Sequence, residues 1–103
     1  MSNEKLSELQ EELDALWRAK RTVTIEDVES ALVAEWDYKL GEKTTVVLLK
    51  LKSGFEVLGH SGCVDPASYN HEVGKKYARE RALSKVWELE GYLLQSKLSL
   101  ETH

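Results

Sequence analysis

The last third of the chain, residues 70–97, constrains the fold more than any other stretch, because its apolar residues recur at helical spacing. At about 100° of rotation per residue, one apolar row comprises Ala78, Ala82, Val86, Leu89 and Leu93. A second row lies about 100° to 140° from Ala82 and comprises Leu83, Trp87 and Leu94. The two rows cover about half of the circumference, which is wider than the stripe of a simple surface helix. We predict one long helix that packs against more than one neighbour.

Four charged residues interrupt this apolar arc. Glu90 lies between the two rows, and Lys75, Arg79 and Glu72 lie over the same face nearer the helix start. An ionised side chain in such a place needs a partner or a shifted pKa. Two interpretations stay open. Either the cations reach solvent and Glu90 pairs with a basic group, or these charges mark a ligand or partner site.

Residues 44–52 and 55–61 predict a β-hairpin, since both runs are rich in β-forming residues. The dipeptide at 53–54, Ser-Gly, predicts a two-residue turn. That register places Leu49 opposite Leu58 and leaves both faces of the sheet apolar. Such a sheet needs two covers. We expect the long helix to cover one face, and the first helix or a second subunit to cover the other.

The rest of the chain completes an α+β pattern. Leucines at a 3-4-3 spacing predict an N-terminal helix within residues 1–20, and a capping-box sequence at Thr24 predicts a short second helix. Apolar and charged residues alternate over 34–40, which predicts a half-buried strand. We predict a single domain over 1–103: an N-terminal helix that serves oligomerisation, a short second helix, a three-stranded antiparallel meander, and the long C-terminal helix packed on the sheet.

Composition narrows the function classes. A chain of 103 residues supports one modest core. Its net charge of −4 disfavours a dedicated duplex-DNA binder, which usually carries a basic surplus. No apolar run approaches the length of a membrane span, and no signal-peptide pattern follows Met1. The single cysteine, Cys63, forms no internal disulfide and fits a reducing, intracellular setting.

The loop at 59–66 holds the residues that thiol or metal chemistry would use. Cys63 and Asp65 lie in it with His60, and His71 follows. One cysteine and two histidines lack the paired short spacing of a zinc site, so we predict no metal. A nucleophilic Cys63 with a histidine base stays an alternative, because loop cysteines near a helix start can have a lowered pKa. A packed thiol is the commoner outcome.

The start of the long helix is a better candidate for a binding site than the thiol or metal chemistry of the loop, because a helix start can bind an anion. Free amides there, with Lys75 and Arg79 one turn in, can hold a phosphate or a carboxylate, whereas Glu72 and Asp65 oppose it. A self-capped helix with ion pairs along its surface is the competing interpretation. We predict no catalytic residue and no cofactor. The candidate ligand-binding residues are Cys63, Asp65, Glu72, Lys75, Arg79 and Glu90.

Four short motifs follow one another in a fixed order. They are Ser53-Gly54-Phe55, Gly59-x-Ser61-x-Cys63-Val64-Asp65-Pro66, Glu72-Val73-Gly74-Lys75 and Trp87-x-Leu89-Glu90-Gly91-Tyr92-Leu93-Leu94. Together they resemble a family of small tailed-phage proteins, named for gene product forty-nine of a podophage and gene product sixty-six of a Shigella phage. The resemblance covers about residues 24–98. The resemblance implies a phage or prophage origin, and it implies little about any reaction or ligand. His60 departs from the acidic residue of the family pattern, which weakens a His–Cys catalytic pair.

Small phage proteins of this size are commonly accessory proteins that bind host factors or defence components. By that analogy of origin, we expect a non-enzymatic, homo-oligomeric binding module in the host bacterial cytoplasm. Its target would be a host or anti-phage defence protein, or a small nucleotide-like anion. One alternative is a nucleic-acid-binding regulator that uses Arg18, Lys20, Arg21 and the basic patch at 75–81. The other is a thiol enzyme built on Cys63.

Overall fold

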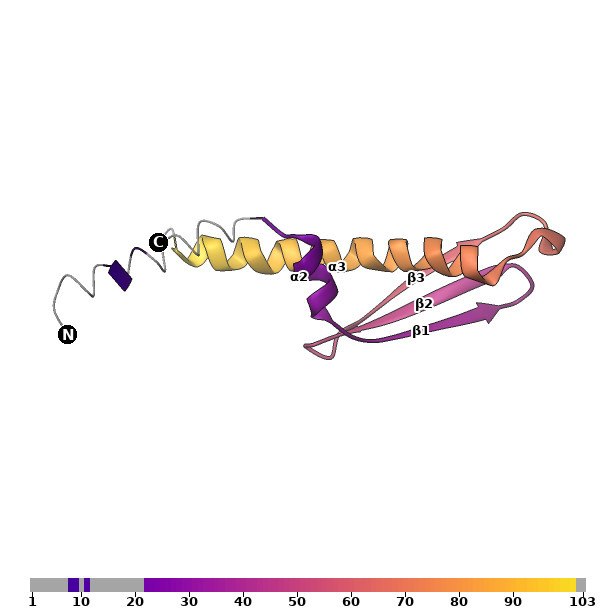
Figure 1. The fold of residues 1–103 in the computed structure, drawn as a ribbon, viewed down its shortest axis with the longest axis horizontal. Coiled ribbons are helices and arrows are strands. Elements are labelled where there is room, and N and C mark those ends of the chain that lie inside the picture. Colours follow the sequence, from indigo (N-terminus) through magenta and orange to yellow (C-terminus); the bar gives the residue numbers. More distant parts are fainter. Residues whose placement is uncertain (1–7, 10, 12–21, 102–103) are drawn as a thin grey trace.

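The computed structural model describes residues 8, 9, 11 and 22–101, which include one antiparallel sheet with two helices on one of its faces (Figure 1). In chain order the elements are α2 (Ile25–Ala31), β1 (Leu32–Leu40), β2 (Thr44–Leu51), β3 (Glu56–Gly62), the 3-10 helix η1 (Pro66–Ser68) and α3 (His71–Glu101). The α+β class, the three-stranded meander and the long C-terminal helix are confirmed. The predicted first helix, within residues 1–20, lies almost entirely outside the described residues.

Local sequence signals determine where α2 and α3 begin. Thr24 caps α2 through a complete capping box: its hydroxyl accepts from the Asp27 amide at 3.2 Å, and its own amide donates to the Asp27 carboxylate at 2.9 Å. Asn70 caps α3, because its side-chain oxygen accepts from the Val73 amide at 3.1 Å. Both helices therefore start where the chain supplies a side chain for an otherwise unpaired first-turn amide.

The predicted register of the hairpin is wrong by one residue. Leu49 pairs with Val57 rather than with Leu58, because the loop between β2 and β3 has three residues, not two. The Leu51 amide donates to the Phe55 carbonyl at 2.8 Å, and Gly54 adopts a φ of 91° at the end of the loop. Since side chains alternate along a strand, this shift exchanges the faces of all β3 residues relative to β2.

The core lies between the sheet and the two described helices. α2 contributes Val28, and α3 contributes a row of small residues at its centre. The sheet contributes Val47, Leu49 and Leu51 from β2 and Val57 from β3. The row on α3 comprises Ala78, Ala82 and Val86, all fully buried. Small residues in this row let the helix backbone lie close to the strands.

Two glycines mark the places of closest approach. A Cβ atom added to Gly59 on β3 would overlap the backbone of Ala78 and Ala82, with the Ala82 Cα only 3.0 Å away. A Cβ atom added to Gly74 on α3 would overlap the side chain of Thr45. Glycine at both positions is therefore a packing requirement between α3 and the sheet.

The helix α3 is longer than the sheet that it crosses. Its 31 residues span about 46 Å, whereas a strand of eight residues, such as β2, spans about 26 Å. The first half of α3 packs on the sheet, and the second half extends beyond it, past α2 (Figure 1). Among the helices of the described part, none is long and apolar enough to cross a membrane.

Candidate functional site

The charged side of β1 faces α3 rather than solvent. Glu35 and Asp37 pair across the strands with the buried Leu49 and Val47, so they point to the same face of the sheet as those core residues. The apolar side of β1 consequently faces the other way. This orientation defines two surfaces, a polar one whose side chains are bonded to α3 and an apolar one on the other side of the sheet.

Beneath α3, two cations satisfy the acidic residues of β1. Lys75 Nζ lies 3.3 Å from Asp37 Oδ2. Arg79 joins three elements, since its Nε lies 2.9 Å from Glu35 on β1 and its Nη2 lies 3.2 Å from Glu29 on α2. Burial lowers the pKa of Arg79, but the hydrogen bonds to Glu29 and Glu35 outweigh burial and hold it above its ordinary value. These ion pairs attach β1 and α2 to α3.

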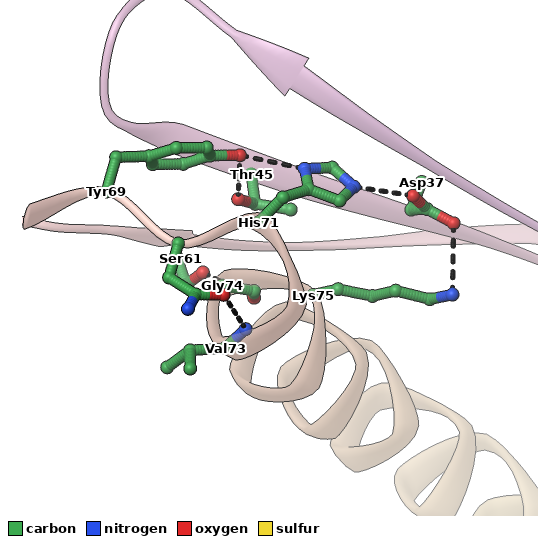
Figure 2. Close-up of polar contacts among 9 residues, drawn as sticks. Asp37, Thr45, Ser61, Tyr69, His71, Val73, Gly74 and Lys75 are labelled. Carbon is green, nitrogen blue, oxygen red and sulfur yellow. Dashed lines mark hydrogen bonds and ion pairs between the residues drawn. The ribbon is translucent and has the colours of Figure 1, made fainter. Parts of the chain in front are cut away.

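A chain of side-chain hydrogen bonds continues from Asp37. His71 Nε2 lies 2.7 Å from Asp37 Oδ1, and His71 Nδ1 lies 2.8 Å from the Tyr69 hydroxyl. The Tyr69 hydroxyl also lies 2.7 Å from Oγ1 of the fully buried Thr45 (Figure 2). With His71 protonated at Nε2, each of these hydroxyl and imidazole donors has an acceptor within the chain. The hydrogen bond from His71 is the largest cause of the lowered pKa of Asp37; burial opposes it, and Lys75 reinforces it.

We call this set of side chains the polar row. It comprises Glu29, Glu35, Asp37, Thr45, Tyr69, His71, Lys75 and Arg79. No buried side-chain nitrogen or oxygen lacks a hydrogen-bond partner in the part of the chain that the structure describes. The polar row therefore forms a satisfied connection between α3 and the edge strand β1.

The opposite face of the sheet is apolar and partly exposed: its outer strands carry exposed side chains, whereas Val46 on the central strand is buried. Cross-strand pairing aligns Trp36, Leu48 and Leu58 in one row across all three strands. In the next row, Val46 on β2 lies between Tyr38 on β1 and His60 on β3. We call the set Trp36, Tyr38, Leu40, Val46, Leu48 and Leu58 the open face. No described helix lies on this side (Figure 1), and Trp36 and Tyr38 are 39% and 52% exposed.

Charged and polar residues border the open face. Lys50 and Glu56 pair across β2 and β3 at one end, and His60 lies on β3 toward the other. An apolar, aromatic centre with a polar border is the usual anatomy of a protein–protein contact surface. Trp and Tyr are also among the residues that most often dominate binding energy.

The six residues predicted to bind a ligand do not form one cluster of hydrogen bonds. Lys75 and Arg79 belong to the polar row, and Glu72 is exposed in the first turn of α3. Cys63 donates its thiol proton to the Asp65 carbonyl at 3.3 Å, while the Asp65 carboxylate accepts from the Ala67 amide and caps η1.

Glu90, the remaining predicted residue, is half-buried farther along α3. It lines a groove of about 730 Å³ between α3, α2 and the β2–β3 loop. A smaller cavity of about 270 Å³ near the start of α3 is lined in part by Cys63, Ser61 and Tyr69. These two cavities are separate, so Glu90 and Cys63 do not share a pocket.

Several contacts of the polar row were not predicted from the sequence. The acidic partners Glu29, Glu35 and Asp37 and the Tyr69–His71 connection emerge only in the structure. Two patterns in the sequence carried a signal. The alternation over 34–40 placed three charged residues on one side of β1, and the helical spacing placed two cations, Lys75 and Arg79, on the sheet-facing side of α3. Pairing those two observations would have predicted the ion pairs.

Comparisons with known proteins bear on origin rather than on chemistry. No curated protein and no solved structure matches the chain. One family model does, and it covers residues 19–98, which include all three strands and most of α3. The match confirms the resemblance in the four motifs. The chain belongs to the phage protein (N4 Gp49/phage Sf6 gene 66) family.

Proposed function

We propose that this phage protein is a non-enzymatic binding module that acts on a host or anti-phage defence protein in the bacterial cytoplasm. We further propose that the open face is its contact surface. The observation that carries the proposal is the outward orientation of Trp36 and Tyr38, on a strand whose charged side is bonded to α3.

The size of the open face supports this role. With strands about 4.8 Å apart and residues about 3.3 Å apart, the whole side formed by three strands of about eight residues measures about 380 Å², and the open face is the apolar part of it. An apolar patch of a few hundred Å² on a small protein is often functional. A surface of this size fits a compact epitope or an extended segment of a partner.

The attachment of β1 to α3 supports it as well. The ion pairs of Asp37 and Glu35 with α3 attach the edge strand β1 to the rest of the fold. A preformed surface loses little side-chain and backbone freedom when it binds. The polar row thus favours a binding surface that is ready before the partner arrives.

The engaged cations favour a protein target over a nucleotide-like anion. Lys75 and Arg79 already neutralise carboxylates. Arg81 and Lys85 donate to the backbone carbonyls of His60 and Leu58. An incoming phosphate would have to compete with these contacts for each cation, at a net protein charge of −4.

The arrangement of nucleophile and base candidates favours a binding role over catalysis. Both ring nitrogens of His71 are engaged, one with Tyr69 and the other with Asp37. The Cys63 thiol donates to a backbone carbonyl. A thiol enzyme would instead need its base within hydrogen-bonding reach of the sulfur.

Site-specific photo-crosslinking in expressing or infected cells tests the proposal. A photoreactive phenylalanine analogue replaces Tyr38 on the open face in one protein, and Tyr77 on α3 in a matched control. The two tyrosines are 52% and 50% exposed, so they sample solvent equally. We expect a host or defence protein to crosslink at position 38 and not at 77. The purified target should then bind wild type, with affinity reduced at least about tenfold by Trp36→Ala.

Two outcomes would contradict the proposal. Equal crosslinking of the same target at positions 38 and 77 would mean that the open face is not the contact surface. Crosslinking at position 38 to a second copy of this chain alone would make the open face a contact between subunits.

A further inference from the structure

The apolar row that packs on the sheet continues along α3 after the sheet has ended. In the first half of the helix this row is Ala78, Ala82 and Val86, all fully buried. In the second half it continues as leucines at 89, 93 and 100, of which Leu93 is 47% exposed and Leu100 is 76% exposed. The residues of this row change from small to large at the point where α3 extends beyond the sheet. Large apolar residues at regular spacing indicate that another element packs there.

The spacing of the row is that of a coiled-coil seam. Positions 82, 86, 89, 93, 96 and 100 alternate intervals of four and three residues, which is the a/d pattern of a heptad repeat. Leucines occupy three of the last four of these positions, and Ser96 occupies the other. The second half of α3 therefore has the pattern of a helix that pairs with another helix.

A groove lies beside this seam. It has a volume of about 730 Å³, and Leu89 and Leu93 form part of its lining. On the other side it is lined by Ala31 of α2 and by Leu51 and Phe55 of the hairpin. A helix lying on the leucines would also contact these side chains.

Two opposite charges flank the seam on the same side. Glu90 and Lys97 lie seven residues apart, two helical turns, and both line the groove. Within the described residues, no hydrogen bond or ion pair involves either side chain. In an antiparallel pair of identical helices, residues on this side of the seam face one another across it. Glu90 of each copy then meets Lys97 of the other, so the segment is complementary to itself.

The position of the sheet selects the antiparallel direction. The sheet lies on the same side of α3 as the seam, alongside the first half of the helix. In a parallel pair both sheets would occupy the space between the two helices and collide. In an antiparallel pair the sheets lie at opposite ends, and each helix end reaches the groove of the other copy.

We propose that residues 87–101 of α3 pair antiparallel with the same segment of a second copy of this chain. Leu89, Leu93 and Leu100 form the seam, and Glu90 of each copy pairs with the partner subunit's Lys97. The dimer has a two-fold axis near the middle of this segment and carries an open face at each end. The inference is independent of what the open face binds.

Charge reversal tests this pairing on the full-length protein. Glu90→Lys places like charges across the seam, and so does Lys97→Glu. Each variant alone is expected to raise the dimer dissociation constant at least about tenfold. Mixed together, the two variants regain both ion pairs, so one tagged variant should recover the other from the mixture. The control is Glu88→Lys, which reverses an exposed charge on the opposite side of α3 and should leave the dissociation constant unchanged.

Light scattering and sedimentation at micromolar concentration read out the stoichiometry. A dimeric wild type, weakened single variants and a recovered mixed dimer establish the pairing. A monomeric wild type overturns it, as does a mixture in which the two variants do not associate. In that case, if Leu93→Glu lowers the free energy of unfolding of the monomer, the seam is covered within the chain.

Discussion

At the scale of single residues, Asp37 uses both carboxylate oxygens within the polar row. One carboxylate oxygen accepts from His71 and the other pairs with Lys75, at the edge of the fold. Neither partner is adjacent in sequence. The carboxylate thus connects β1 to the start of α3. Through His71 and Tyr69 the connection continues to Thr45 on the central strand β2.

The lowered pKa of Asp37 makes its contribution to stability dependent on pH. A carboxyl group whose pKa is lower in the folded state stabilises the fold fully above the unfolded pKa of about 3.9. That contribution is lost as the pH falls through the folded pKa. We expect wild type to be more stable than Asp37→Asn at pH 7, and the difference to shrink below about pH 4. Urea unfolding at several pH values measures it.

The exposed Glu42 in the β1–β2 turn supplies the control. Glu42→Gln should show little difference from wild type at any of these pH values, because surface substitutions usually change stability by less than about 0.5 kcal/mol. A difference between wild type and Asp37→Asn that stays constant down to pH 2 would contradict a linked titration.

At the scale of elements, the contact between α3 and the sheet is set by close backbone packing. Gly59 on β3 faces the helix backbone at Ala78 and Ala82, where an added Cβ atom has no space. We expect Gly59→Ala to lower the free energy of unfolding by about 1–3 kcal/mol, the usual cost of overpacking. The matched control is Gly62→Ala on the same strand, where the added carbon would meet only Lys43 O at 3.7 Å. Chemical denaturation of both variants compares them, and equal stability would mean that the helix is not held this close.

At the scale of the whole molecule, the core cluster of the described residues lies on the face of the sheet that packs against α2 and α3. Val47 is fully buried under α3, whereas Trp36 is exposed on the open face. We expect Val47→Ala to cost about 2 kcal/mol, and Trp36→Ala to cost less than about 1 kcal/mol despite its larger side chain. Thermal and urea unfolding decide the order. A larger loss for Trp36→Ala would show that the open face is covered within the protomer.

The two proposals assign the exposed apolar surfaces to different partners. In the first proposal the open face binds a foreign protein, and in the second proposal the second half of α3 binds a second copy of the chain. A dimer of this kind would present two binding surfaces. A target with two copies of its epitope would then bind more tightly than a target with one copy, because both surfaces could be occupied at once. The two surfaces can be disabled separately, because they lie on different elements.

The sequence by itself determined features that depend on neighbouring residues. The cap at Thr24 and the alternation in β1 follow from contacts within a few residues, and the helical spacing over residues 70–97 predicted that α3 is long. The α+β class follows from these periods, because a helix and a strand each show their buried side at a fixed spacing. The family motifs gave the phage origin in the same way, as short patterns in order.

Only the tertiary structure decided which side of each element faces the core. The register of the hairpin depended on one extra loop residue, and it moved Val57 rather than Leu58 onto the core side. The alternation in β1 fitted either orientation until Lys75 and Arg79, about 40 residues away, were placed opposite its charged side. The physical reason is that such choices rest on contacts between distant segments, where burying an apolar row and pairing a charged row compete for the same face.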